Sequence, residues 1–223
     1  MISRSRLFTR QSPSRDAKSI YIIGEGVSRE KQYFKYFKEL DSRINIEYYD
    51  LKHTEDNSPN GLWNIALACL VKSEENPNPK YELLEEDEVW IVLDTDVDKA
   101  NSREIPIQKL RKNCGTKNWN VAQSNPCFEV WLYYHFNSQK PNFDNMHICG
   151  NWKQELTNVG GFNSNKEPIY IEQAIINSES NFSRDSNLAP VIGATEVHFL
   201  AKVIFSFVKV QIAEALTLNS QKL

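Results

Sequence analysis

The chain has 223 residues, enough for one sizeable hydrophobic core with a smaller appended unit but too few for two full-size domains. Hydrophobic residues make up 40% of the sequence and charged residues 25%, which is typical of a folded, water-soluble protein and argues against disorder. Lysine and arginine number 26 against 29 aspartates and glutamates, so the net charge of -3 alone favours neither a nucleic acid nor a membrane as partner.

The N-terminal segment, residues 1–18, is predicted to be a basic arm rather than a core element. A single acid, Asp16, stands there against five basic residues: Arg4, Arg6, Arg10, Arg15 and Lys18. The apolar run over 19–23 predicts a strand that ends at Gly24. After it, Ser28 can cap a helix whose apolar face would hold Tyr33, Phe34, Phe37 and Leu40.

The same alternation of strand and helix continues to about residue 136. It predicts strands over 44–51, 89–93 and 119–122, and helices over 61–73, 102–113 and 127–136. Such alternation is typical of the α/β class, with a mostly parallel sheet flanked by helices. A polar loop and two helices, over 169–182 and 195–215, follow. We therefore expect an α/β domain over 19–140 and a helical C-terminal extension over 141–223 packed on its core.

The four cysteines, Cys69, Cys114, Cys127 and Cys149, never approach CxxC spacing, and we expect free, buried thiols. The first twenty residues lack the apolar core of a signal peptide. Lysines interrupt even the most apolar C-terminal segment, so no membrane span is expected. The expected compartment is the cytoplasm.

Three acidic clusters follow predicted strands, where open α/β sheets bind their ligands. In the first, Gly24 and Gly26 flank Glu25 and permit a tight turn. Glu30 stands one turn into the next helix and could point towards the same opening. The alternative is structural, because glutamates near helix N-termini are common for reasons of the helix dipole.

The second cluster ends the apolar run VWIVL with Asp94, Asp96 and Asp98. In extended geometry residues two apart share a face, so Asp94 and Asp96 could converge on one cation. Two close carboxylates repel each other unless a hard cation such as Mg²⁺ neutralises them. Asp98 could add to the site or belong to a solvated loop, and a turn-forming aspartate cluster is the alternative for all three.

The third cluster is SNPCFEVW, in which Asn125 and Pro126 predict an extended turn. Glu129 then falls in the first turn of the next helix, near the same edge of the sheet, although complementing the helix dipole would also explain it. His135 and His198 adjoin apolar stripes, which favours structural over catalytic roles.

Taken together, the segments IYIIGEGVSREKQYF, DEVWIVLDTD and QSNPCFEVWLYYHF resemble the RloB-like family of bacterial proteins, whose core belongs to the Toprim class of nucleic-acid enzymes. APVIGATEVHFLAKVI is a weaker match that extends the resemblance over most of the chain. The sequence departs from many relatives at Gly24, where they carry cysteine. GFNSNKEPIY loosely matches a Tyr-x-Lys segment of the family and makes Lys166 a candidate phosphate contact.

The resemblance implies a Toprim-like fold and metal-dependent hydrolysis of phosphodiesters in RNA, such as tRNA, or in DNA. Glu25 would be a metal ligand or general acid/base, Asp94 and Asp96 would hold Mg²⁺ or Mn²⁺, and Glu129 would bind a second ion. Glu30 is a further candidate metal ligand, and Ser124 and Asn125 would orient the substrate. Two metal ions about 4 Å apart could activate a water and stabilise the leaving oxygen. The resemblance also implies an effector of antiphage defence controlled by an ABC-type ATPase, which could form a homodimer.

Two other classes of function stay open. LDTDVD would suit a haloacid-dehalogenase-type phosphatase, in which the first aspartate is the nucleophile, although such enzymes place the motif on the first strand. A non-catalytic, Toprim-shaped regulatory subunit is the other alternative.

The charge is unevenly distributed along the chain. Residues 1–38 hold nine basic and three acidic residues, a net charge of +6, whereas residues 82–98 hold eight acidic and no basic ones, a net charge of -8. A nucleic acid could therefore approach a carboxylate site through a basic segment and bound cations.

Overall fold

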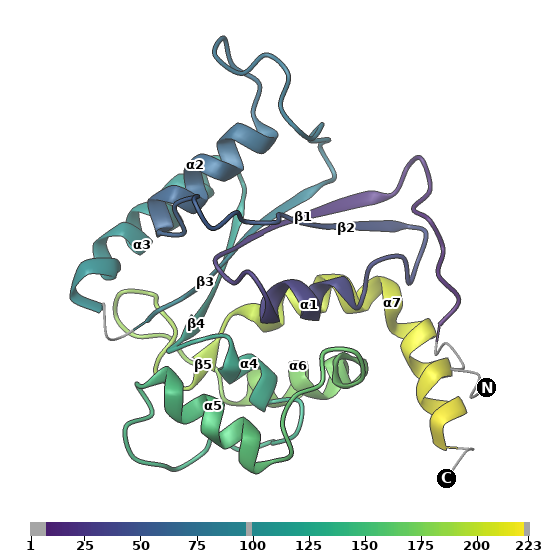
Figure 1. Ribbon diagram of the computed structural model, residues 1–223, viewed down its shortest axis with the longest axis vertical. Helices are drawn as coiled ribbons and strands as arrows, with labels where there is room; N and C mark the ends of the chain where they lie inside the picture. The colour runs from purple at the N-terminus through teal and green to yellow at the C-terminus, as the bar shows by residue number, and fades with distance from the viewer. Residues whose placement is uncertain (1–7, 97–99, 221–223) are drawn as a thin grey trace.

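The computed structural model describes residues 8–96 and 100–220 (Figure 1). Arg4, Arg6 and Asp98 lie outside the described residues. The strands are β1 (Lys18–Gly24), β2 (Ile44–Tyr48), β3 (Glu88–Asp94), β4 (Asn120–Asn125) and β5 (Ala194–Thr195). The helices are α1 (Arg29–Lys35), α2 (Pro59–Leu70), α3 (Ala100–Thr116), α4 (Glu129–Tyr133), α5 (Cys149–Asn158), the 3₁₀ helix η2 (Glu167–Tyr170), α6 (Ile171–Ser180) and α7 (Val197–Ser220).

The five strands form one sheet in the order β2-β1-β3-β4-β5. The first four are parallel, and only the short β5 runs antiparallel to its neighbour β4. The chain leaves β1 through α1 to reach β2 on one side, and leaves β3 through α3 to reach β4 on the other. The strand order therefore reverses between β1 and β3, and such a switch point opens a crevice at the carboxyl ends of the strands.

Helices cover both faces of this sheet (Figure 1). Ile20, Ile22 and Val92 point to the face covered by α1 and α4–α7, whereas Ile23 and Ile91 point to the face covered by α2 and α3. This alternation along buried strands produces two hydrophobic layers. The predicted α/β class is confirmed, including the helical C-terminal part; the domain boundaries at 18 and 140 stay predictions.

Two elements were not expected from the sequence. Helix α5 contains Gly150 and buries only Trp152 and Leu156, so its apolar pattern is short. Strand β5 has two residues, too few for an alternating pattern. Among the described helices, none is both long and apolar enough to cross a membrane.

The prediction of four free thiols is wrong for one pair, because Cys127 and Cys149 form a disulfide with their Cα atoms 5.8 Å apart. The two residues are 22 positions apart in the sequence, and α5, which brings Cys149 to the turn after β4, was not expected. Cys69 and Cys114 are free and buried, as predicted.

Candidate active site

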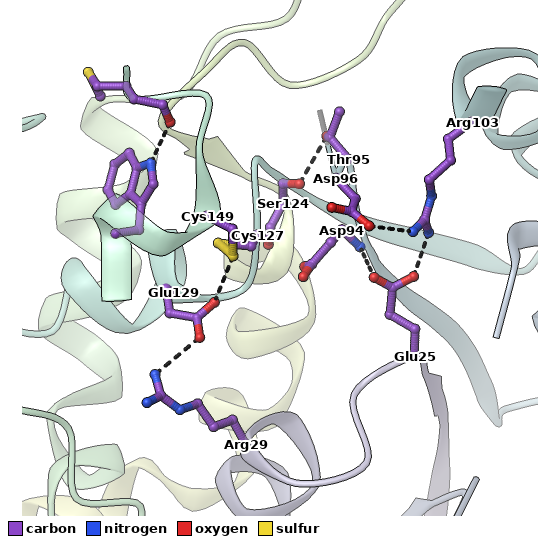
Figure 2. Close-up of a disulfide and its surroundings, with 12 residues drawn as sticks. Glu25, Arg29, Asp94, Thr95, Asp96, Arg103, Ser124, Cys127, Glu129 and Cys149 are labelled. Carbon is purple, nitrogen blue, oxygen red and sulfur yellow. Dashed lines mark hydrogen bonds and ion pairs between the residues drawn. A yellow bond between two sulfur atoms is a disulfide. The ribbon is translucent and has the colours of Figure 1, made fainter. Parts of the chain in front are cut away.

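The switch point between β1 and β3 brings the first two acidic clusters together. Glu25 follows the last residue of β1, and its N–H donates to the carbonyl of Val92 at 3.2 Å. Asp94 is the last residue of β3, and its N–H donates to Oε1 of Glu25 at 3.2 Å. The parallel pairing of the two strands thus places both carboxylates in the same crevice (Figure 2).

Arg103 from α3 contacts two carboxylates of the crevice, those of Glu25 and Asp96 (Figure 2). Its Nη2 is 2.5 Å from Oε2 of Glu25, and its Nη1 is 3.5 Å from Oδ2 of Asp96. The side chains of Arg103 and Glu25 are only 12% and 11% exposed, so this contact is largely shielded from water. Sequence reasoning missed Arg103, because one basic residue in a polar helix has the pattern of a solvated side chain.

Asp96 lies near Glu25 and Arg103, but its backbone conformation differs from the one predicted. The strand stops at Asp94, and Asp96 has a left-handed backbone with φ 52°, so the extended geometry expected for the pair is wrong. Backbone hydrogen bonds from the DxD turn to the turn after β4 hold it, with Thr95 N–H donating to Ser124 at 2.8 Å and Asp96 N–H to Pro126 at 3.1 Å.

Asp94 has the most unfavourable electrostatic position of these carboxylates. Its Oδ1 is buried without a hydrogen-bond partner among the described residues. Burial, followed by the charges of Glu25, Glu30 and Glu129, raises the pKa of Asp94 well above its usual range. Burial also raises the pKa of Glu25, although Arg103 opposes this shift. The crevice therefore concentrates negative charge that a cation or protons must compensate.

Glu30 adds to that charge from α1. It is 3% exposed and accepts a hydrogen bond from the Tyr48 hydroxyl at 3.0 Å. Burial and the nearby charge of Glu25 raise the pKa of Glu30 to about 8. Gly26 leaves room for it, because a Cβ at that position would lie 2.6 Å from Oε1 of Glu30. Thus glycine is required here by the close approach of a buried carboxylate.

Glu129, the first residue of α4, contacts different partners. It is 5% exposed; its Oε1 accepts from Arg29 at 3.1 Å, and its Oε2 lies 3.6 Å from Sγ of Cys149. In Figure 2 its carboxylate lies beside the disulfide, apart from the group formed by Glu25, Asp96 and Arg103. Its negative charge nonetheless contributes to the raised pKa of Asp94.

The predicted substrate-binding residues lie in three different settings. The Ser124 hydroxyl is buried and hydrogen-bonded to that of Thr195 at 2.7 Å. The amide of Asn125 donates to the carbonyl of Pro190 at 2.8 Å, and its Oδ1 is buried without a partner among the described residues. Lys166 is exposed in the loop between α5 and η2. The described contacts do not connect Lys166 with the carboxylates.

Two adjoining surface hollows, one of them lined by Arg29, together form what we call the arm groove. They share Gln32, Ser164 and Asn165. One is also lined by Arg29, which contacts Glu129, and the other by Arg10, Lys35 and the aromatic ring of Phe8. Glu167 is the acidic residue of the lining. A groove lined by three cations, one of which pairs with the buried Glu129, has the charge pattern that suits a phosphate backbone.

Comparison with protein families adds one finding. The family model described as RloB-like protein matches residues 20–204, more than four fifths of the chain. Neither a curated protein nor a solved structure matches this chain.

Proposed function

The chain belongs to the RloB-like family, and from this premise we propose that it is a Toprim-type nuclease that hydrolyses phosphodiester bonds of RNA or DNA with Mg²⁺ or Mn²⁺. Family membership alone does not specify this activity. The proposal depends on the resemblance of the sequence motifs to Toprim enzymes and on the chemistry of the carboxylate crevice.

The observation that carries the proposal is the buried Oδ1 of Asp94 beside Glu25, which has no hydrogen-bond partner among the described residues. Oxygen ligands with excess negative charge suit a hard divalent cation, and such a cation would reverse the repulsion that raises the pKa of Asp94. Glu25, Asp94 and Asp96 would hold it. Their ligand atoms do not form a group within 4.8 Å in the described part of the chain, so the three side chains would have to move closer together to bind one ion. Arg103 would then release Glu25 and Asp96.

The bound cation would supply Lewis-acid catalysis and lower the pKa of a bound water. The protein's own part is to position the substrate. Arg10, Lys35 and Arg29 along the arm groove would bind successive phosphates, and Arg29 would orient the strand beside Glu129. Arg103, once released from Glu25, would be a second contact for the scissile phosphate.

The biological role follows from the family resemblance alone. We propose that the protein acts in bacterial antiphage defence and that an ABC-type ATPase controls its activity. A second copy of the chain is a further candidate partner.

The test is a cleavage assay on end-labelled single-stranded and duplex RNA and DNA, with Mg²⁺, Mn²⁺ or EDTA, with and without the candidate ATPase. We expect cleavage that needs the metal and falls at least about a hundredfold in Asp94→Asn and Glu25→Gln. Glu179→Gln, a surface carboxylate elsewhere, is the matched control. Unchanged cleavage in both site variants would assign the activity to a contaminant.

Absence of cleavage under every condition would refute the proposal and leave the regulatory-subunit alternative. A phosphoaspartyl intermediate trapped at Asp94 would instead identify a phosphatase.

A further inference from the structure

The turn after β4 and the start of α5 bring three potential metal ligands together. One ligand atom from each of Cys127, Glu129 and Cys149 lies within 4.8 Å of the other two. Within the described ranges these residues are the one group of three that meets this criterion. Two of the ligands come from one turn and the third from a helix 20 residues further along the chain, so folding assembles the group.

The environment of Glu129 is the second observation. Its Oε1 is hydrogen-bonded to Arg29, but its Oε2 faces Sγ of Cys149 at 3.6 Å. A disulfide sulfur carries no proton to donate, and the described residues offer Oε2 no other donor. A carboxylate oxygen in such a buried position calls for a proton or a cation. Reduction would provide a thiol proton, and loss of that proton would let a metal ion bind.

Two cysteine sulfurs and one carboxylate are ligands that favour zinc. Thiolates favour Zn²⁺ over Mg²⁺, and Zn²⁺ binds sulfur at ~2.3 Å in a tetrahedral site, which places two sulfurs ~3.8 Å apart. The Cα atoms of the cysteines are 5.8 Å apart, a separation that allows side-chain rotation to reach this spacing. Zn²⁺ with two thiolates and one carboxylate has one negative charge, which Arg29 would balance.

We propose that Cys127, Glu129 and Cys149 form a redox-switched zinc site, occupied when the disulfide is reduced and abolished when it forms. A dithiol reductant supplies two electrons and two protons, the S–S bond breaks, and the reductant becomes a disulfide. Zn²⁺ then displaces the two thiol protons, and a water takes the fourth position. Zinc would fix Glu129 to the cysteines, away from the carboxylates around Asp94. The proposal concerns a second metal and does not rest on the proposed nuclease function, although both involve Arg29.

The probe is Co²⁺, titrated into the full chain after anaerobic reduction and removal of the reductant. We expect a near-ultraviolet thiolate-to-cobalt charge-transfer band and the visible bands of tetrahedral cobalt, both corresponding to one thiolate-bound Co²⁺ per chain, and we expect one equivalent of Zn²⁺ to remove them. The oxidised chain should show neither. If the reduced chain develops no charge-transfer band, the pair is a structural disulfide only and the proposal fails.

Matched variants locate the site. Cys149→Ser should weaken Co²⁺ binding at least tenfold and halve the charge-transfer intensity per ion bound, whereas Glu129→Gln should weaken binding but keep the intensity. Cys69→Ser removes a buried free thiol elsewhere and should change nothing. A Cys149→Ser protein with the wild-type spectrum and affinity would overturn the assignment.

Asp94→Asn separates this proposal from the nuclease proposal. It should keep the cobalt spectrum whether or not the protein cleaves nucleic acid.

Discussion

The Arg103 guanidinium and the Glu25 carboxylate form an ion pair, with Nη2 2.5 Å from Oε2, where β1 and β3 end. Arg103 also lies 3.5 Å from Asp96, so it pairs with two of the three carboxylates proposed to bind a cation. Its positive charge compensates these carboxylates, and under the proposed function it would compete with the metal ion for them.

Removing this arginine should therefore have two opposite effects. Arg103→Gln is expected to lower the melting temperature in EDTA by several degrees, because the carboxylates lose their compensating charge. It should also tighten Mn²⁺ binding about tenfold, the equivalent of ~1.4 kcal/mol, measured by titration calorimetry. Lys109→Gln, at an exposed position on the same helix, is the control and should change neither value. Weaker Mn²⁺ binding in Arg103→Gln would show that the arginine supports the metal site rather than competing with it.

The raised pKa of Asp94 makes stability depend on pH and metal together. Burial and neighbouring carboxylates raise this pKa, so the folded state binds the proton more tightly than the unfolded state and loses stability as pH rises. Without metal, the melting temperature of the wild type should fall relative to that of Asp94→Asn as the pH rises from 4.5 to 8.5. Mg²⁺ should raise the melting temperature of the wild type most at pH 8.5 and leave that of Asp94→Asn almost unchanged. Equal Mg²⁺ effects in the two proteins would exclude Asp94 as a ligand.

Glu196 connects α3, strand β4 and the loop after α6. It is 1% exposed, accepts from Arg111 at 2.5 Å and Arg184 at 2.8 Å, and accepts the N–H of Gln123 at 3.1 Å. Glu196→Gln leaves two arginines without their counter-ion, and we expect a loss of about 3 kcal/mol in the free energy of unfolding, measured with urea.

The matched control for that loss is Glu179→Gln. Glu179 also pairs at 2.5 Å, with Lys202, but the two side chains are 54% and 42% exposed. Water screens this pair, so the change should stay within ~0.5 kcal/mol. Similar losses in the two variants would contradict the role assigned to burial.

His135 is a buried histidine of the core. Burial lowers its pKa to about 3, against 6.5 for an ordinary histidine, so the unfolded state binds the extra proton first as pH falls. Its contribution to stability is complete above pH 6.5 and declines between pH 6.5 and 3. The melting temperature should fall less between pH 7 and pH 4.5 in His135→Phe than in the wild type, whereas the exposed His53→Gln should follow the wild type. Parallel curves for His135→Phe and wild type would contradict the low pKa.

Local sequence patterns predicted the parts of this structure that local chemistry determines. Apolar runs predicted β1 and β3, and the turn residues after them predicted that Glu25 and Asp94 would lie at one edge of the sheet. The crevice could be expected because a parallel sheet gathers the carboxyl ends of its strands on one side.

The missed features depend on contacts between distant segments. Arg103 is 78 residues from Glu25, and the disulfide depends on a helix whose weak apolar pattern gave no signal. The left-handed turn at Asp96 depends on the carbonyl of Pro126, a partner that the DxD motif does not reveal.

Under the proposed function, Glu25, Asp94 and Asp96 hold a catalytic divalent cation. The most direct measurement is an anomalous-difference map from crystals soaked in Mn²⁺. We expect a peak at ~2.1–2.2 Å from oxygens of Glu25 and Asp94, with Arg103 moved away from Glu25. A map without a peak in the crevice, with the Arg103–Glu25 pair intact at saturating Mn²⁺, would contradict the claim.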